Sequence, residues 1–125
     1  MLPKRILVVD DEENLCTIIK ISLEYLGGWQ VLVATSSREG LLLAETELFD
    51  LILLDVVIPN MDGLTLLRAL RINPVTRTIP VILLTAKTQP VNSNESAQLG
   101  VVGVIIKPFD PVDLPNQIRA FLRWE

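Results

Sequence analysis

Apolar runs of strand length alternate with stretches of helical period along the chain. The apolar runs are rich in branched aliphatic residues and predict strands at residues 5–10, 30–34, 51–55, 81–84 and 104–106. The third run is broken only by Asp55 between Asp50 and Pro59, which is typical of a strand buried on both faces. Asp55 therefore either caps the turn that follows or faces a functional crevice beyond the strand end.

The first three intervening stretches predict helices with clear boundaries. Gly27-Gly28 should close the first helix, because glycine accepts the left-handed conformation of a C-terminal cap. Ser36 and Glu39 form a capping-box pattern for a second helix that runs to about Leu48. The third should begin at Asp62-Gly63 and stop before Asn73-Pro74. The predicted core face of the first helix carries Leu15, Ile18, Ile19, Leu23 and Leu26.

The two later stretches predict helices of unequal strength. Residues 87–100 are polar and include Pro90, so a helix from about Asn94 should be short and loosely held. The last helix should begin between Pro111 and Asp113, because Pro115 is tolerated only in the first turn. Its predicted core face carries Leu114, Ile118, Phe121 and Leu122.

This alternation predicts a parallel sheet covered by helices on both faces, the doubly wound α/β class. No linker, repeat or low-complexity tract interrupts it, so we expect a single domain over residues 1–125. The second strand ends in Ala34-Thr35 while the others end in stronger functional groups, which favours an edge position for that strand.

Composition excludes several classes of function. Half of the 125 residues are hydrophobic, but no apolar run approaches the ~20 residues that span a bilayer, and the N-terminus does not resemble a signal peptide. The single cysteine, Cys16, excludes an internal disulfide and fits a reducing cytoplasm. A formal net charge of −4 does not indicate the basic surface that binding to nucleic acid requires. The absence of histidine excludes histidine-based triads and nearly all zinc sites.

Four of the five predicted strands end in a group able to do chemistry. These groups are Asp10-Asp11, Asp55, Thr85 and Lys107. Each has a structural explanation of its own: the acids and the threonine can cap helices, and the lysine can be a solvated surface residue. Because the carboxyl ends of parallel strands share one edge of a sheet, their joint occurrence indicates a site.

Three clustered carboxylates repel one another, so cations must hold them ionised. Lys107 supplies one positive charge, and Mg²⁺ is the natural second, since it prefers oxygen ligands and commonly bridges carboxylates to phosphate. The site is then suited to a phosphoryl group, with Asp55 as nucleophile and the Thr85 hydroxyl as a hydrogen-bond donor.

At these residues the chain resembles the receiver domain of two-component response regulators, the family of the chemotaxis response regulator. The resemblance implies a flavodoxin-like sheet with strand order 2-1-3-4-5. It covers nearly the whole chain, and its combination of motifs is highly specific. The motifs are Val9-Asp10-Asp11, Leu54-Asp55, Pro59-Asn60-Met61-Asp62-Gly63, Thr85-Ala86 and Lys107-Pro108-Phe109.

The resemblance also implies a role for each site residue. Asp55 would be the phosphoacceptor. Mg²⁺, or Mn²⁺ in its place, would be bound directly by Asp11, mainly through water by Asp10, and also by Asp55 and the backbone carbonyl of Val57.

The other implied roles concern the phosphoryl group and its surroundings. Thr85 and Lys107 would contact the phosphoryl oxygens, and the small Ala86 would leave room beside them. The Lys107-Pro108 peptide bond would be cis, as in the family.

By the same resemblance, the chain is a cytoplasmic signalling phosphoacceptor rather than an enzyme in the usual sense. It would take its phosphoryl group from a sensor histidine kinase or a histidine phosphotransfer protein, assist its own magnesium-dependent phosphorylation and dephosphorylation, and relay the change as a conformational switch. Phosphorylation-dependent dimerisation is a further expectation, and direct contact with nucleic acid or membrane is not expected.

Two positions depart from the family pattern. Many receivers carry tyrosine or phenylalanine three residues before the lysine, where this chain has Val104, and the usual Gly-Ala before the last strand is Gly100-Val101. A β-branched valine has few rotamers to exchange, so we expect switching to rest on Thr85 and residues 87–100 instead.

Three alternatives compete with this interpretation. A haloacid-dehalogenase-type enzyme needs a second acid two residues after the nucleophile, where Val57 stands. A dinucleotide-binding domain needs a glycine-rich turn where the chain has Asp10-Asp11-Glu12-Glu13. The remaining alternative is a receiver-like interaction module that is not switched by phosphate, which Val104 favours mildly and the complete set of site residues disfavours.

Overall fold

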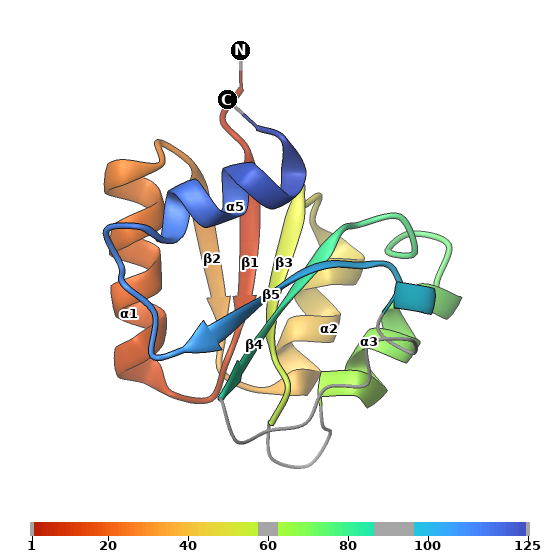
Figure 1. Ribbon diagram of the computed structural model, residues 1–125. Helices are drawn as coiled ribbons and strands as arrows, with labels where there is room; N and C mark the ends of the chain where they lie inside the picture. The colour runs from red at the N-terminus through yellow and green to blue at the C-terminus, as the bar shows by residue number, and fades with distance from the viewer. Residues whose placement is uncertain (1, 58–62, 87–96, 125) are drawn as a thin grey trace.

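The computed structural model describes residues 2–57, 63–86 and 97–124, which follow the predicted alternation of strands and helices (Figure 1). The strands are β1 (Arg5–Val9), β2 (Gln30–Ala34), β3 (Leu51–Asp55), β4 (Val81–Ala86) and β5 (Val101–Lys107). The helices are α1 (Glu13–Ile21), its π-helical continuation η1 (Ser22–Leu26), α2 (Ser37–Thr46), α3 (Gly63–Ile72) and α5 (Leu114–Leu122).

The strands form one parallel sheet in the order β2-β1-β3-β4-β5. This confirms the doubly wound class, the predicted order and the edge position of β2. Every residue of β3 is buried, as predicted for a central strand covered on both faces. None of the helices in the described ranges is both long and apolar enough to cross a membrane.

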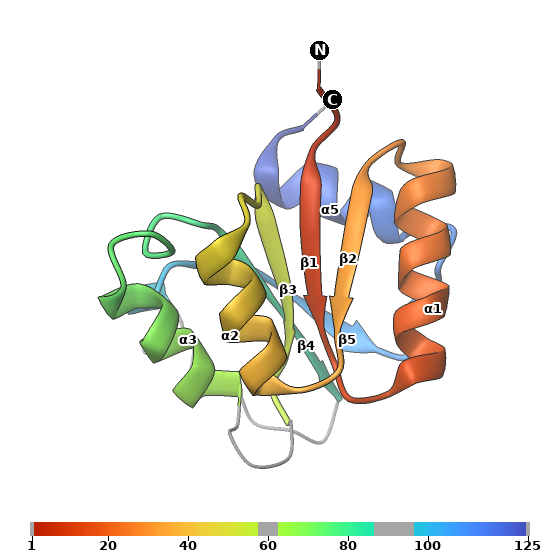
Figure 2. The same ribbon diagram turned by 180° about the vertical axis from the view of Figure 1, so that it is seen from behind.

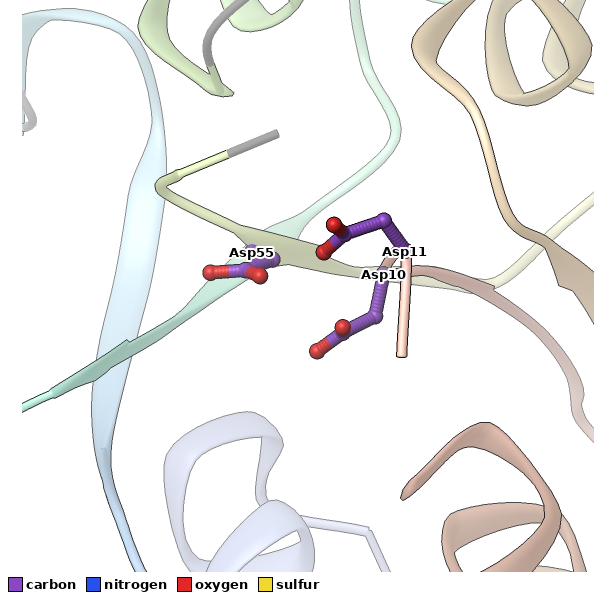
Figure 3. Close-up of side chains that lie close together, drawn as sticks. All are labelled: Asp10, Asp11 and Asp55. Carbon is purple, nitrogen blue, oxygen red and sulfur yellow. The ribbon is translucent and has the colours of Figure 1, made fainter. Parts of the chain in front are cut away.

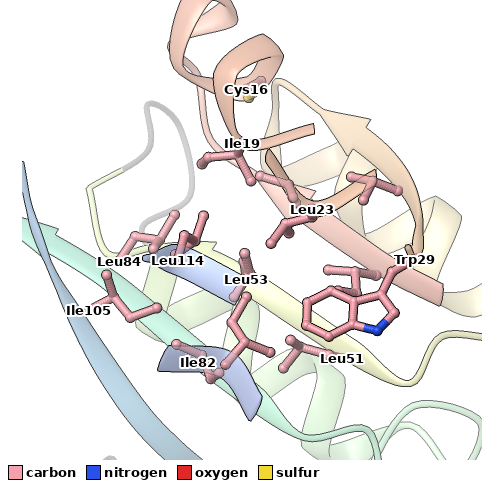
Figure 4. Close-up of a cluster of buried hydrophobic side chains, with 14 residues drawn as sticks. Cys16, Ile19, Leu23, Trp29, Leu51, Leu53, Ile82, Leu84, Ile105 and Leu114 are labelled. Atoms are coloured by element: carbon pink, nitrogen blue, oxygen red, sulfur yellow. The ribbon is translucent and has the colours of Figure 1, made fainter. Parts of the chain in front are cut away.

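Helices cover the two faces of the sheet in separate layers. Figures 1 and 2 show α1 and α5 on one face and α2 and α3 on the other. The α1/α5 face buries a cluster that includes Leu53 of the central strand, Leu23 of η1 and Leu114 of α5 (Figure 4). The opposite face buries Leu54 against helix residues such as Leu67 of α3. Alternate residues of each strand thus enter different cores.

The capping predictions are largely confirmed. The Ser36 hydroxyl accepts a hydrogen bond from the Glu39 N–H at 3.1 Å, and the Glu39 carboxylate reaches back to the N–H of Thr35, one residue before the cap. Gly28 takes the left-handed conformation after the first helix, with φ of 73°. The second helix ends at Thr46, two residues earlier than predicted, and Leu48 is exposed.

The predicted core face of the first helix is partly wrong. Ile18 and Leu26 are 44% and 49% exposed, while Cys16, Ile19 and Leu23 are buried. The cause is geometric: the buried stripe runs through positions 16, 19 and 23, and the last turn widens into the π-helical η1, which rotates Leu26 off that stripe.

The C-terminal elements also differ from their predicted bounds. β5 begins at Val101, three residues earlier than predicted, because parallel pairing with β4 extends along that length despite Gly103. The last helix begins at Leu114, with Pro115 in its first turn, and Phe121 remains 39% exposed because it lies over the edge strand at Gly103. Most of the short helix predicted from Asn94 lies outside the described residues.

Candidate functional site

Three carboxylates meet at the carboxyl edge of the sheet. Asp10 and Asp11 directly follow β1, and Asp55 is the last residue of β3. Each offers an oxygen within 4.8 Å of the others, and Figure 3 shows the three side chains grouped together. Asp10 and Asp55 are buried, whereas Asp11 is exposed, so the cluster opens to solvent on the Asp11 side.

The two-residue period of the strands brings the buried acids together. Asp10 continues the alternation that buries Val8 on the α1/α5 face, and Asp55 continues that of Leu53 on the same face. β1 and β3 are neighbours in the sheet, so the two side chains emerge side by side where the apolar core ends. The strand pattern that forms the core therefore also places the acids.

Lys107 completes the charged site from β5. Its Nζ lies 2.8 Å from Asp10 Oδ2, 3.4 Å from Asp55 Oδ2 and 3.8 Å from Glu12 Oε1. Its side chain is only 17% exposed, so its ion pairs with the buried Asp10 and Asp55 are poorly screened by water, whereas Glu12 is 64% exposed. One ammonium group thus contacts two buried carboxylates and a third, exposed one, so the cluster keeps an excess of negative charge.

The pKa values of the central pair reflect this environment. Burial raises the pKa of Asp55 and the Asp10 charge adds to the increase, while a hydrogen bond from the Val57 N–H and the charge of Lys107 oppose it. Burial alone would lower the pKa of Lys107, but its hydrogen bond to Asp10 and the charges of Asp10 and Asp55 outweigh burial and raise it. Ionisation of Asp55 is therefore less favourable than that of a free aspartate, while the neighbouring acids favour the charged form of Lys107.

The other predicted phosphoryl-contacting residues lie on the neighbouring strands. Thr85 is buried near the end of β4, and its hydroxyl donates to the Ala86 carbonyl at 3.2 Å. Ala86 pairs with Lys107 across the β4–β5 ladder. The Lys107–Pro108 peptide bond is cis in the structure. The edge therefore holds a hydroxyl, a small side chain and an ammonium next to the acids.

The remaining two predicted positions are both partly exposed valines. Val57 is 52% exposed and its N–H donates to Asp55 Oδ1 at 3.1 Å, which ties the turn after β3 to the acid. Val104 is 37% exposed and lies opposite Leu83 in the ladder, on the face of β5 away from the buried Ile105. Val104 is therefore separate from the charged site.

Two residues near the site were not singled out from the sequence. Glu12 joins it through Lys107, and its N–H donates to Asp10 Oδ1 at 3.0 Å. Gly63, the first residue of α3, packs against the backbone of Asp55 and Val56, and its N–H donates to the Val56 carbonyl at 2.9 Å. In the sequence, the signal for such a close approach is the glycine of Asp62-Gly63, at the predicted start of a helix.

Gly63→Ala should destabilise the protein by about 2–3 kcal/mol, because a Cβ there would collide with the Asp55 carbonyl oxygen and lie 2.8 Å from the Val56 Cα. Backbone on both sides has little freedom to move. In Gly40→Ala, by contrast, the atoms nearest to the new Cβ belong to the Val9 side chain rather than to backbone, so we expect a smaller loss. Urea unfolding of both variants measures the difference, and an equal loss in the two would contradict this account.

Comparison with known proteins gives consistent matches over nearly the whole chain. A family model of the response regulator receiver domain matches residues 6–119. The alkaline phosphatase synthesis transcriptional regulatory protein PhoP of Bacillus subtilis is 38% identical over 120 residues, which are 96% of this chain and 49% of that protein. The phosphate regulon regulator PhoB of Pseudomonas aeruginosa is 36% identical over 98% of this chain and 53% of its own length. The chain spans about half the length of these relatives.

Solved structures agree at the level of the fold. The chemotaxis protein CheY4 of Vibrio cholerae superposes with a TM-score of 0.86 at 29% identity, covering 95% of this chain and 98% of CheY4. A CheY-like response regulator receiver domain protein from Methanospirillum hungatei gives a TM-score of 0.84 at 35% identity, covering 97% and 94% of the two chains.

Proposed function

Since the chain belongs to the response regulator receiver domain family, we propose that it accepts a phosphoryl group on Asp55 and relays the change as a conformational switch. Domains of this family are signalling modules of two-component systems. The observation that carries the proposal is the cluster of three carboxylates within 4.8 Å with Lys107 in contact with two of them. We propose that this receiver domain spans residues 1–125.

The donor set fits a hard divalent cation. Asp10, Asp11 and Asp55 present carboxylate oxygens, the ligand type that Mg²⁺ prefers, and Mn²⁺ accepts the same set. Asp11 would hold the ion directly and Asp10 mainly through water, with Asp55 and the Val57 carbonyl as further ligands. When bound, the ion supplies positive charge to the carboxylates and to the phosphoryl oxygens.

The chain's own residues have distinct roles in the proposed transfer. An Asp55 carboxylate oxygen attacks phosphorus, the bond from phosphorus to the donor breaks, and its electron pair leaves with the donor. Lys107 exchanges part of its contact with Asp55 for the phosphoryl oxygens, and Thr85 turns its hydroxyl from the Ala86 carbonyl toward them. The small Ala86 side chain leaves room for the group.

The donor is proposed from the family, whose receiver domains take phosphoryl groups from histidine kinases. The chain contains no histidine, so the phosphohistidine belongs to a partner, either a sensor kinase or a histidine phosphotransfer protein. Phosphorylation-dependent dimerisation and a cytoplasmic location remain predictions. The transcriptional role in the names of PhoP and PhoB is theirs and is not assigned to this chain.

The second candidate is an interaction module of the same fold that phosphate does not switch. Val104 favours it, since this partly exposed valine has neither ring nor hydroxyl and is separate from the charged site. Two incubations of the protein with phosphoramidate, one containing Mg²⁺ and one containing EDTA, distinguish the two functions. We expect an acid-labile phosphoryl group that forms only with Mg²⁺, and a chain that stays unlabelled in both would be the interaction module.

Millimolar Mg²⁺ should raise the thermal midpoint of unfolding, because three clustered acids share one lysine in the metal-free protein. A ligand that binds only the folded state adds about 1.4 kcal/mol when present at about ten times its Kd. Asp11→Ala removes the exposed ligand and should abolish the response. Identical midpoints with and without Mg²⁺, or an Asp11→Ala variant that still responds, would count against the metal site.

A further inference from the structure

An open groove of about 430 Å³ leads to the charged site from one side. Apolar side chains such as Leu15, Ile18 and Phe109 form most of its lining, together with Ala86 beside the site. Among the described residues, its ionisable lining groups are Glu12 and Lys107. A phosphodonor that entered by this groove would meet these two charges.

The two charges differ in how they are held. Lys107 is 17% exposed and already in contact with the buried Asp10 and Asp55. Glu12 is 64% exposed, and its carboxylate lies 3.8 Å from Lys107 Nζ. Its backbone is fixed to the site by the hydrogen bond from its N–H to Asp10 Oδ1, at 3.0 Å. Glu12 therefore presents a negative charge to the groove beside the lysine, from a backbone position that is tied to the site.

We propose that Glu12 is a specificity-determining residue that favours phosphodonors whose leaving group carries a positive charge before transfer over donors whose leaving group departs as an anion. The inference rests on the proposed function, with Asp55 as the phosphoacceptor. In an in-line transfer the leaving group departs on the side of phosphorus opposite Asp55, toward the entrance of the site. A carboxylate at that entrance attracts a protonated nitrogen and repels an acid anion.

Two small donors carry these opposite charges. In zwitterionic phosphoramidate the Asp55 oxygen bonds to phosphorus, the P–N bond breaks, and the electron pair leaves on nitrogen, so that the bound ammonium departs as neutral ammonia. In acetyl phosphate the same attack breaks the P–O bond, and the electron pair leaves on acetate, which departs as an anion. Glu12 opposes the approach of anionic acetyl phosphate and the development of negative charge on its leaving oxygen, and it attracts the ammonium group of phosphoramidate.

The test compares wild type, Glu12→Gln and Glu13→Gln, with phosphoramidate and with acetyl phosphate, in the presence of Mg²⁺. Glu13 is the matched control, because it lies next in the sequence and carries the same charge but lines a separate groove on the other side of α1. The rate of intact-mass increase gives kcat/KM for each donor. Thermal midpoints of the three proteins report any structural effect of the substitutions.

We expect Glu12→Gln to raise the ratio of acetyl phosphate to phosphoramidate kcat/KM by about twofold to threefold, the size expected for one solvated charge near the reacting groups. Glu13→Gln should leave the ratio unchanged, and added salt should reduce the Glu12 effect. An unchanged ratio in a Glu12→Gln protein that labels normally would overturn the inference. Wild-type protein that neither donor labels would instead overturn the proposed function.

Discussion

Replacing Asp55 by asparagine is expected to abolish acid-labile phosphorylation. The amide keeps the size of the side chain and its acceptor for the Val57 N–H but has no carboxylate oxygen with which to attack phosphorus. Intact-mass measurement after incubation with phosphoramidate and Mg²⁺ reports the loss directly.

Asp50→Asn is the matched control for this variant, because Asp50 lies at the opposite end of β3 and accepts a hydrogen bond from the Arg5 N–H at 2.8 Å. The Asp50 variant should be labelled as fast as wild type. Full labelling of Asp55→Asn would show that another residue is the phosphoacceptor.

Replacing Lys107 by methionine is expected to cost about 3 kcal/mol of unfolding free energy in metal-free buffer. The substitution keeps the aliphatic stem and removes the ammonium that lies 2.8 Å from the fully buried Asp10 and 3.4 Å from Asp55. Loss of one partner leaves a buried charge uncompensated, which is far more costly than loss of an exposed pair. Urea unfolding measures the difference.

Lys20→Met is the matched control for the lysine variant. Lys20 pairs with Glu24 at 3.6 Å, but both side chains are 40% exposed or more, so we expect a loss of about 1 kcal/mol or less. Mg²⁺ should stabilise Lys107→Met more than wild type, because the acids of the variant lack any other cation. Equal stability of the two lysine variants would contradict the proposed electrostatics of the site.

Much of the architecture follows from local patterns. The aliphatic runs predict the strands, because burial on both faces demands apolar residues at every position, as in β3. The carboxyl ends of parallel strands share one edge, so the sequence predicts that Asp10, Asp55 and Lys107 meet there. The ion pairs of Lys107 with both acids confirm this. The order of the strands came from the family resemblance, since strand patterns do not specify which strands are neighbours.

The differences arise where spatial contacts override local pattern. The π-helical turn of η1 changes which side of the first helix is buried. The spacing of apolar residues such as Ile18 and Leu26 does not predict such a turn. The contribution of Glu12 depends on the turn after β1 and the end of β5 lying at the same edge of the sheet, which brings together side chains 95 positions apart in the sequence. Gly63 is required by its contact with the backbone of Asp55; a glycine at a helix start signals a close approach, but the sequence does not show which backbone it approaches.

The location of the phosphoryl group on the wild-type chain tests the central claim most directly. Borohydride reduction of the protein labelled in Mg²⁺ converts an aspartyl phosphate to homoserine, which peptide mass spectrometry can place in the sequence. We predict a single modified position, Asp55. A stable label on a serine or threonine, or reduction at Asp10 or Asp11 with Asp55 intact, would contradict the assignment.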